Sequence, residues 1–313
     1  MSFLARRLAL TLLTLFLVSL LTFVCFSLIP GDAASLILGT EAGEEQVAAL
    51  RKEFGLDRSA AERYFSWLHG FAGGNLGNSV RFRGEAISDL VLSRLPVTFS
   101  LALLSLVFIV ILSLLFSLPA AGKAGSLLNR IINTMAAAGI SVPGFFLGVL
   151  FIWVFGILFK FFSPGAFVPF RESPRGFFGC LIFPALAIAI PNAAIVIKFL
   201  RSSIAAQLES PYARTARSKG APFSLVLRRH VLKNALIPAV TILGMIIGEV
   251  FSGSIIIEQV FTIPGIGRLL ITSISSRDYP LVQTLLVYIA SAVILANTLV
   301  DIVIQFIDPR IRL

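Results

Sequence analysis

The sequence predicts an all-α polytopic membrane protein with six transmembrane helices. Of its 313 residues, 57% are hydrophobic and 13% are charged, whereas soluble domains average about 45–50% and about 25%. The few charges lie between long apolar runs, each of which reaches the ~20 residues needed to cross ~30 Å of hydrocarbon. Such runs differ from the ~10-residue alternating segments of membrane β-barrels. The net charge of +10 is scattered between these runs instead of forming one basic face, so we expect no nucleic-acid partner.

Charge-poor stretches set the bounds of the six predicted helices. In chain order these are Leu8–Ile29, the stretches between Arg94 and Lys123, Arg130 and Lys160, and Arg175 and Lys198, then Lys233 to Ile257, and Asp278 to Asp301 with an extension to Ile307. The 22 uncharged residues of the first stretch exceed the ~7–15 of a signal peptide's apolar core, so we expect it to stay in the mature protein. Proline lacks the amide donor of a helix interior, which predicts kinks or breaks at Pro143, Pro184 and Pro191.

Lysine and arginine residues in the short connections predict the orientation, because these residues are retained on the cytoplasmic side. One side of the predicted bilayer has five: Lys160, Arg171, Arg175, Arg268 and Arg277. The other side has fourteen: Arg6, Arg7, Lys123, Arg130, Lys198, Arg201, Arg214, Arg217, Lys219, Arg228, Arg229, Lys233, Arg310 and Arg312. Both termini are therefore predicted to be cytoplasmic.

This topology divides the chain into three regions. An N-terminal transmembrane helix within residues 1–30 precedes an extracytoplasmic region at 31–95, and a transmembrane core at 96–313 contains a cytoplasmic loop at 205–233.

The extracytoplasmic region is predicted to hold two short helices. Apolar residues at helical spacing indicate one helix over Glu44–Phe54, ended by Gly55, and a second over Ala60–Leu68. The glycines of Gly73–Gly77 predict a tight turn.

Motifs of catalysis and metal binding are missing from the sequence. Gly122-Lys123 lacks both the upstream glycine and the following Ser or Thr of a Walker A phosphate loop. Gly139-Ile140-Ser141 is followed by Val142-Pro143 and lacks the spacing of a nucleophile elbow. His69 and His230 fall on opposite sides of the predicted bilayer, which makes a shared metal site implausible. We therefore expect neither enzymatic activity nor a metal or cofactor bound by this chain.

Two carboxylates, Glu249 and Asp301, fall within the predicted spans, where buried charge is costly and often functional. Because no opposite charge lies deep in the spans, Glu249 is interpreted as lining a hydrated cavity or bonding a neighbouring helix, and Asp301 as interfacial. A proton relay in a secondary transporter is the alternative. Asn192 and Ser252 join Glu249 as candidates for lining a translocation path.

Small residues recur at four-residue spacing in two predicted spans. Gly144 and Gly148 form one such set, and Gly244, Gly248 and Ser252 form the other. Small residues on one helix face allow backbones to approach closely. These faces predict helix contacts within the chain or with a partner subunit.

A short helix outside the membrane is predicted over Ser210–Gly220. Ser210 is a favourable N-cap and Pro211 suits the first helical position. Gly220 is a typical residue just beyond a helix end. The segment is basic and rich in small residues, without the large apolar face of a helix buried in lipid. Two defined ends favour a rigid element that docks another protein; the alternative is an ordinary positively charged loop, continued by Arg228–Lys233.

Motifs along the whole chain match a known family pattern. They include Leu28–Asp32, Phe54–Asp57, Asn75–Ser79, Arg94–Thr98, Ser141–Pro143, Tyr212–Gly220, Arg229–Pro238, Gly253–Phe261, Pro264–Arg268, Asp278–Pro280 and Asp308–Arg310. Together they resemble the permease subunits of peptide/nickel-type ABC importers. In that family the "EAA" loop, here Tyr212–Gly220 with Arg229–Pro238, places its helix in a cleft of the ATPase subunit. This chain departs from the usual pattern at Pro211 and Asn75, where Asp is common, while Arg214 and Thr215 replace the Glu and first Ala of the general motif.

The resemblance implies a type I ABC importer permease fold in a bacterial inner membrane. It implies four kinds of partner: the lipid bilayer, a second homologous permease subunit, two ATPase subunits that bind ATP and Mg²⁺, and an extracytoplasmic substrate-binding protein. The ATPase-docking coupling helix would comprise Ser210, Pro211, Tyr212, Ala213, Arg214, Thr215, Ala216, Arg217, Ser218, Lys219 and Gly220. Candidate contacts with the binding protein lie in 31–95 and in Phe261–Pro280, at Pro264, Gly265, Arg268 and Asp278.

The resemblance also indicates the class of substrate. Related permeases carry dipeptides, oligopeptides, glutathione-like peptides or chelated nickel, and peptides are expected here because the sequence has no His/Cys cluster for a bare metal ion. A proton-coupled secondary transporter and a structural membrane protein are the alternatives from other classes. The missing Walker A motif together with a capped cytoplasmic helix favours an ATPase supplied by another chain.

Overall fold

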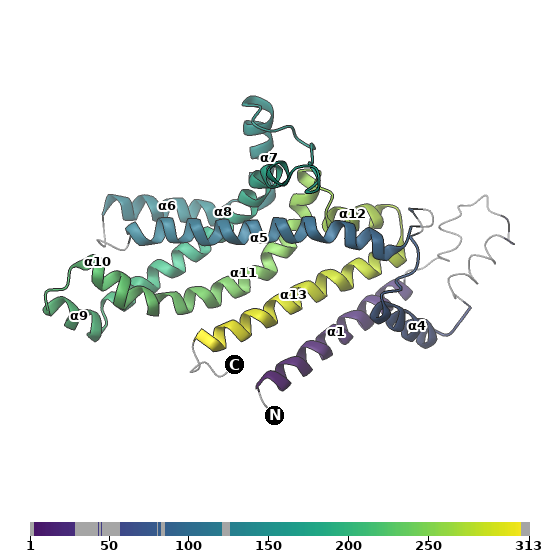
Figure 1. The fold of residues 1–313 in the computed structure, drawn as a ribbon, viewed down its shortest axis with the longest axis horizontal. Coiled ribbons are helices and arrows are strands. Elements are labelled where there is room, and N and C mark those ends of the chain that lie inside the picture. The colour runs from purple at the N-terminus through teal and green to yellow at the C-terminus, as the bar shows by residue number, and fades with distance from the viewer. Residues whose placement is uncertain are drawn as a thin grey trace. The chain divides into compact units, whose positions relative to one another are not determined.

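The computed structural model describes residues 3–28, 43, 45, 57–79, 81–82, 85–120 and 126–307, and these residues are almost entirely helical. The elements in chain order are α1 (Phe3–Ser27), α4 (Ala60–Gly73), α5 (Ile87–Ala120), α6 (Leu127–Ser141), α7 (Gly144–Phe151), the π-helix η1 (Ile152–Leu158), α8 (Pro174–Leu208), α9 (Pro211–Ser218), α10 (Phe223–Leu225), the π-helix η2 (Val226–Val231), α11 (Leu232–Val260), α12 (Ile266–Ser275) and α13 (Tyr279–Ile307) (Figure 1). Several predictions lie wholly or largely outside the described residues: the helix over Glu44–Phe54 with Gly55, and the motifs Leu28–Asp32, Phe54–Asp57, Gly122-Lys123 and Asp308–Arg310.

Among the described residues, five continuous apolar helices are long enough to cross a membrane: Ala5–Ser27, Ile87–Pro119, Pro174–Leu208, Phe223–Val260 and Tyr279–Ile302. They correspond to predicted spans one, two, four, five and six. The third predicted span consists of α6 followed by α7 and η1, which are bent by 98° relative to each other. If the bent pair of α6 with α7 and η1 is one membrane span, the described residues hold six spans.

The proline predictions have different outcomes. Pro143 lies at the bend, where it is the N-cap residue of α7, so the predicted break is confirmed there. At Pro184 and Pro191, where a kink or a break was predicted, no break occurs, because α8 continues through both positions. Pro191 frees the carbonyl of Ala187 in the preceding turn. Gly144 of α7 packs against this carbonyl so closely that an added Cβ would lie 3.1 Å from its oxygen.

The chain divides by internal contacts into two compact units. Unit 1 comprises Met1–Val97 and Pro264–Leu295, and unit 2 comprises Thr98–Ile263 and Ala296–Leu313. The predicted division into 1–30, 31–95 and 96–313 follows membrane topology and stays a prediction.

Unit 1 is built around two clusters. Tyr64 of α4 is buried, shares a hydrogen bond with Ser19 of α1 at 2.9 Å and contacts the rings of Phe16 and Phe23. The helix over Ala60–Leu68 is thereby confirmed, and it extends to Gly73. The second cluster joins the start of α5, α12 and the first part of α13 through Leu76, Ile87, Leu90, Val91, Ile266, Leu269, Leu270, Leu281, Val282 and Leu285.

The turn after α4 has the predicted glycine geometry. Gly74 and Gly77 have φ angles of 78° and 76°, in the left-handed region that glycine adopts without steric cost. Asn78 then forms an isolated bridge with Ala86 just before α5.

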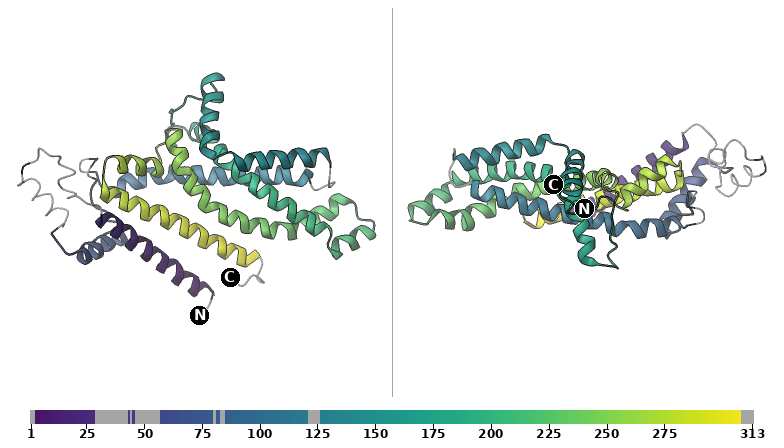
Figure 2. Two further views of the ribbon diagram at one scale, coloured as in Figure 1. Left: turned by 180° about the vertical axis from the view of Figure 1, so that it is seen from behind. Right: turned by 90° about the horizontal axis from the view of Figure 1, so that it is seen from above.

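Unit 2 is centred on α8, which packs against α6, α7 and α11. Gly148 of α7 permits close packing against the end of α11, since an added Cβ would lie 3.1 Å from the Phe261 ring and 3.2 Å from Ile257. The close approach predicted for the Gly144/Gly148 face is therefore made within the chain. Within this unit, α9 lies at one end of the helices and α7 near the other (Figures 1 and 2).

Candidate functional site

The predicted short helix is α9, whose eight residues Pro211–Ser218 lie at the end of unit 2 between α8 and α10 in the chain (Figure 1). Two backbone hydrogen bonds close its C-terminal end. The Gly220 amide donates to the Arg217 carbonyl at 2.9 Å, and the Ala221 amide donates to the Ala216 carbonyl at 3.2 Å. With φ of 79° at Gly220, this is a Schellman motif. The turn that reverses the chain here is therefore specified by a residue without a side chain.

The N-terminal end of α9 differs in one detail from the prediction. Ser210 occupies the N-cap position and Pro211 the first turn, as expected. The Ser210 hydroxyl, however, donates to the Gln207 carbonyl at 2.6 Å and leaves the amides of α9 uncapped by this side chain. Gln207 also accepts a hydrogen bond from the Tyr212 hydroxyl at 2.5 Å. The helix start is thus tied backward to the end of α8.

A small buried side chain anchors α9 to the rest of unit 2. Ala213 is fully buried in a cluster with Leu200, Ile204, Val226, Leu227, Val231, Ala235 and Ala239, which come from α8, η2 and α11. Ala216 and Ala221 pack against the same cluster. One face of α9 is therefore fixed to the two long helices that precede and follow it, so movement of α9 would be transmitted to both.

Most other side chains of α9 and of its C-terminal end are exposed, and three of them are basic. Arg214, Thr215, Arg217, Ser218 and Lys219 are all exposed. Arg217 also donates to the Leu208 carbonyl, which holds its guanidinium near the end of α8. Further exposed basic side chains follow on η2, at Arg228, Arg229 and His230.

A second candidate surface runs along α11. Residues spaced three or four positions apart are exposed along its length: Pro238, Thr241, Met245, Glu249, Ser252, Ile256 and Gln259. This spacing places them on one face of the helix. The predicted path residues Glu249 and Ser252 lie on this face, while Met245 between polar positions is 70% exposed. A stripe of mixed polarity with a carboxylate is unfavourable against lipid and suits a partner subunit or a hydrated path.

The other predicted path residue lies on a different helix. Asn192 is a half-buried residue of α8, and its side-chain amide donates to the Ile188 carbonyl at 2.9 Å. Asp301, predicted at the interface, lies half-buried in α13.

The predicted binding-protein contacts lie around α12 and the start of α13 in unit 1. Pro264 and Arg268 are half-buried and Gly265 is buried. Asp278 is fully buried: its carboxylate accepts hydrogen bonds from the Ser79 hydroxyl at 2.5 Å, the Arg81 amide at 3.1 Å and the Leu281 amide at 3.3 Å. All three donors belong to this chain, so the structure shows the Asp278 carboxylate bonded within unit 1.

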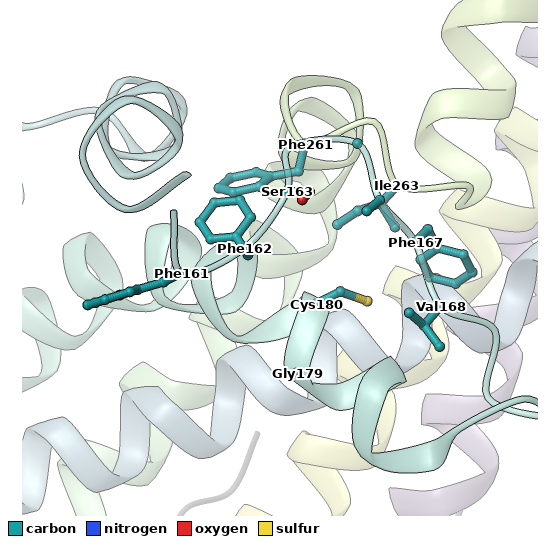
Figure 3. A pocket seen from close by; sticks show the side chains of 11 residues that line it. Phe161, Phe162, Ser163, Phe167, Val168, Gly179, Cys180, Phe261 and Ile263 are labelled. Atoms are coloured by element: carbon teal, nitrogen blue, oxygen red, sulfur yellow. The ribbon is translucent and has the colours of Figure 1, made fainter. Parts of the chain in front are cut away.

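A cavity of about 290 Å³ lies in unit 2, where the connection after η1 folds over α8. Figure 3 shows the rings of Phe162 and Phe261 on one side, Phe167 and Val168 on the other, and the Cys180 sulfur between them. Sequence reasoning missed this cavity, although the density of phenylalanine between Phe151 and Phe183 was a visible signal.

Two polar contacts in unit 2, one of them fully buried, were also missed. The Thr98 hydroxyl of α5 donates to the fully buried Glu258 carboxylate of α11 at 2.6 Å. Arg201 of α8 donates to the side-chain oxygens of Asn129 and Asn133 on α6. Asparagines four residues apart beside a predicted basic boundary were the available signal for the second contact.

Comparison with known proteins gives consistent relationships over the full length. A probable peptide ABC transporter permease protein of Sinorhizobium fredii is 35% identical over 310 residues, which cover 99% of both chains. The glutathione transport system permease protein of Escherichia coli is 35% identical over 313 residues, covering 100% of this chain and 99% of the relative. The crystal structure of an amino acid ABC transporter with histidines is similar in fold, with a TM-score of 0.52 at 18% identity, over 72% of this chain and 95% of that one.

Two family descriptions together account for nearly the whole sequence. The N-terminal model of binding-protein-dependent transport system membrane components matches residues 1–102. The model of the binding-protein-dependent transport system inner membrane component matches residues 113–313, which contain α9, α11 and α12. The resemblance of the motifs, the type I permease fold and the multi-pass helices thus agree. This chain belongs to the binding-protein-dependent transport system inner membrane component family, as a multi-pass ABC transporter permease.

Proposed function

We propose that this chain is one of two homologous permease subunits in a bacterial importer that moves peptides into the cytoplasm. A substrate-binding protein delivers the peptide on the outer side, and two ATPase subunits bind ATP and Mg²⁺ on the inner side. Both termini and α9 then face the cytoplasm, as the distribution of Lys and Arg predicts. The observation that carries the proposal is α9, a short helix with an exposed basic face and a buried anchor.

The coupling step follows from how α9 is held. Its exposed Arg214, Thr215 and Lys219 face away from the cluster that buries Ala213, so they are available to a cleft on an ATPase. Closure of the ATPases on ATP would push α9, and the buried contacts would pass that displacement to α8 and α11. ATP shifts the equilibrium between inward-open and outward-open states only through a difference in affinity for the two.

The translocation path is assigned to the exposed stripe of α11. Glu249 and Ser252 share this face with Met245 and Ile256, which gives both polar and apolar groups for a peptide of varied side chains. A second permease subunit facing the stripe would remove Glu249 from lipid and enclose a hydrated space. Asn192 of α8 stays a further candidate for the path.

Peptides are the proposed substrate class because relatives at 35% identity include a peptide permease and a glutathione permease. Glutathione is itself a short peptide, so a glutathione-like cargo is the alternative within the same mechanism. The outer surface around Pro264 and Arg268 is the proposed contact with the binding protein, together with the outer region at 31–95.

Purification of the tagged chain from native membranes tests the proposal. Mass spectrometry of the intact complex should show a second permease and two ATPase subunits, and uptake in proteoliposomes should require ATP and the binding protein. The ligand released from that binding protein should be a peptide. A chain that purifies alone and drives uptake with a proton gradient would contradict the importer, and a nickel chelate as the ligand would contradict the peptide assignment.

A further inference from the structure

A basic group lies where α6 and α8 pack together in unit 2. Arg201 donates one hydrogen bond from each terminal nitrogen, to Asn133 and to Asn129. These two asparagines are four residues apart on α6, so they lie on one face of that helix. The amide oxygens orient the guanidinium but carry no charge that would neutralise it. The cation keeps three of its five N–H donors for another ligand.

Two more cations flank Arg201. Lys198 precedes it by three residues on α8, which is the spacing of neighbouring side chains on a helix surface. Arg130 follows Asn129 on α6, and both Lys198 and Arg130 are exposed. In the part of the chain that the structure describes, no carboxylate is hydrogen-bonded or paired with Arg130, Lys198 or Arg201. Three positive charges therefore lie on neighbouring turns of α6 and α8 with no carboxylate hydrogen-bonded to them among the described residues.

The position of this group along the helices is that of a membrane surface. The α8 helix has 35 residues, about 52 Å at ~1.5 Å per residue, and so is longer than the ~30 Å hydrocarbon core. Its uncharged run ends at Ile197, directly before Lys198. Exposed apolar side chains lie on the same turns of the two helices, including Leu127 at 74% exposure, Leu128, Ile131 and Met135 on α6, and Phe199 on α8.

We propose that Arg201, held by Asn129 and Asn133, forms with Arg130 and Lys198 a binding site for the headgroup of one anionic phospholipid of the cytoplasmic leaflet. A phosphate diester accepts the fork of N–H donors that a guanidinium offers. The lipid's acyl chains would cover the exposed leucine, isoleucine and methionine side chains of α6. These apolar neighbours favour a lipid over an ATPase subunit, which would meet the polar face of α9 instead.

The lipid-site proposal rests on the cytoplasmic orientation given under the proposed function, and it does not depend on transport activity. Its test is therefore lipid retention by the intact importer complex, measured by mass spectrometry after delipidation and titration with phosphatidylglycerol or with phosphatidylcholine of the same acyl chains. The complex should retain phosphatidylglycerol in preference to phosphatidylcholine. Each cation near a membrane surface contributes about fivefold in affinity for anionic lipid, so an Arg130→Gln/Lys198→Gln double variant should bind phosphatidylglycerol roughly 25-fold more weakly.

Two further variants separate the site from general charge. Arg201→Lys keeps the charge but loses the fork and the two asparagine contacts, and it should also weaken phosphatidylglycerol binding. Arg171→Gln removes an exposed cation from the connection after η1 and should leave binding unchanged. Equal retention of both lipids, or equal binding by the double variant and Arg171→Gln, would overturn the proposal. Loss of the ATPase subunits from the double variant with lipid binding intact would assign the cations to that interface instead.

Discussion

The Ser79 hydroxyl donates to the Asp278 carboxylate at 2.5 Å, although the two residues are 199 positions apart in the sequence. Ser79 also accepts a hydrogen bond from the Phe82 amide at 3.0 Å, and Asp278 accepts from the Leu281 amide in the first turn of α13. One contact therefore joins the loop before α5 to the start of α13 within unit 1. Both residues belong to motifs that identify the family, and the structure gives these motifs a physical role.

Replacing Ser79 should destabilise unit 1. Ser79→Ala leaves a buried carboxylate with one donor fewer, which costs about 1–3 kcal/mol of the free energy of unfolding. Thermal unfolding of the solubilised complex should therefore begin at lower temperature. Ser93→Ala is the matched control, since the Ser93 hydroxyl bonds only the Leu90 carbonyl of its own helix. Equal stability of the two variants would contradict the assigned role of Asp278.

Enlarging Ala213 should disturb the anchor of α9. The residue is fully buried, and extra methylene groups in a packed site cost about 1–3 kcal/mol. Ala213→Leu should insert into the membrane normally but lose stimulation of ATP hydrolysis by the binding protein. Ser202→Leu places the same side chain at an exposed position of α8 and should retain stimulation. Normal stimulation in Ala213→Leu would show that α9 need not be held at this position.

Reversing charge on the exposed face of α9 should uncouple ATP hydrolysis from uptake. Arg214→Glu/Arg217→Glu places two carboxylates where we expect the ATPase, while the buried anchor stays intact. Uptake by proteoliposomes should fall at least tenfold with assembly in the membrane unchanged, and the ATPase subunits should dissociate more readily. Arg171→Glu, a reversal in the connection after η1, serves as control. Wild-type uptake by the double variant would refute docking through α9.

Neutralising Glu249 distinguishes a path-lining side chain from a proton relay. Glu249→Gln keeps the size and polarity of the exposed group on α11, so an ATP-driven importer should retain uptake within a few-fold. Glu249→Leu should reduce uptake further, because it removes a polar group from a hydrated face. Peptide uptake measured with and without a protonophore provides the readout. Complete loss of uptake in Glu249→Gln would favour proton coupling.

Cysteine labelling checks the orientation. Cys180 lines the aromatic cavity of unit 2, which the predicted topology places on the outer side. In a Cys25→Ser background, a membrane-impermeant maleimide should modify Cys180 in right-side-out vesicles and much more slowly in inside-out vesicles. A Cys25→Ser/Cys180→Ser variant sets the background. The reverse preference would place both termini outside.

Local features were predictable because their causes are local. Apolar length indicated the spans, and the proline and glycine around α9 indicated both of its ends within a few residues. Charge was a less accurate guide to helix bounds: α5 begins at Ile87 and α8 runs to Leu208, beyond the charges expected to end them. Charged residues mark where lipid ends, whereas backbone hydrogen bonding continues into water.

By itself, the sequence determined the long apolar helices and both ends of the short helix α9, because hydropathy and helix-end preferences act over neighbouring residues. Its motifs also indicated the permease family by resemblance. The sequence treated Pro143 and Pro191 alike, and only the tertiary structure decided that the first marks a 98° bend while α8 continues through the second. It also decided that Asp278 is an internal acceptor and that Arg201 is held by two asparagines. These outcomes depend on which groups from distant segments meet, since a carbonyl or a charge is satisfied by whatever packs against it.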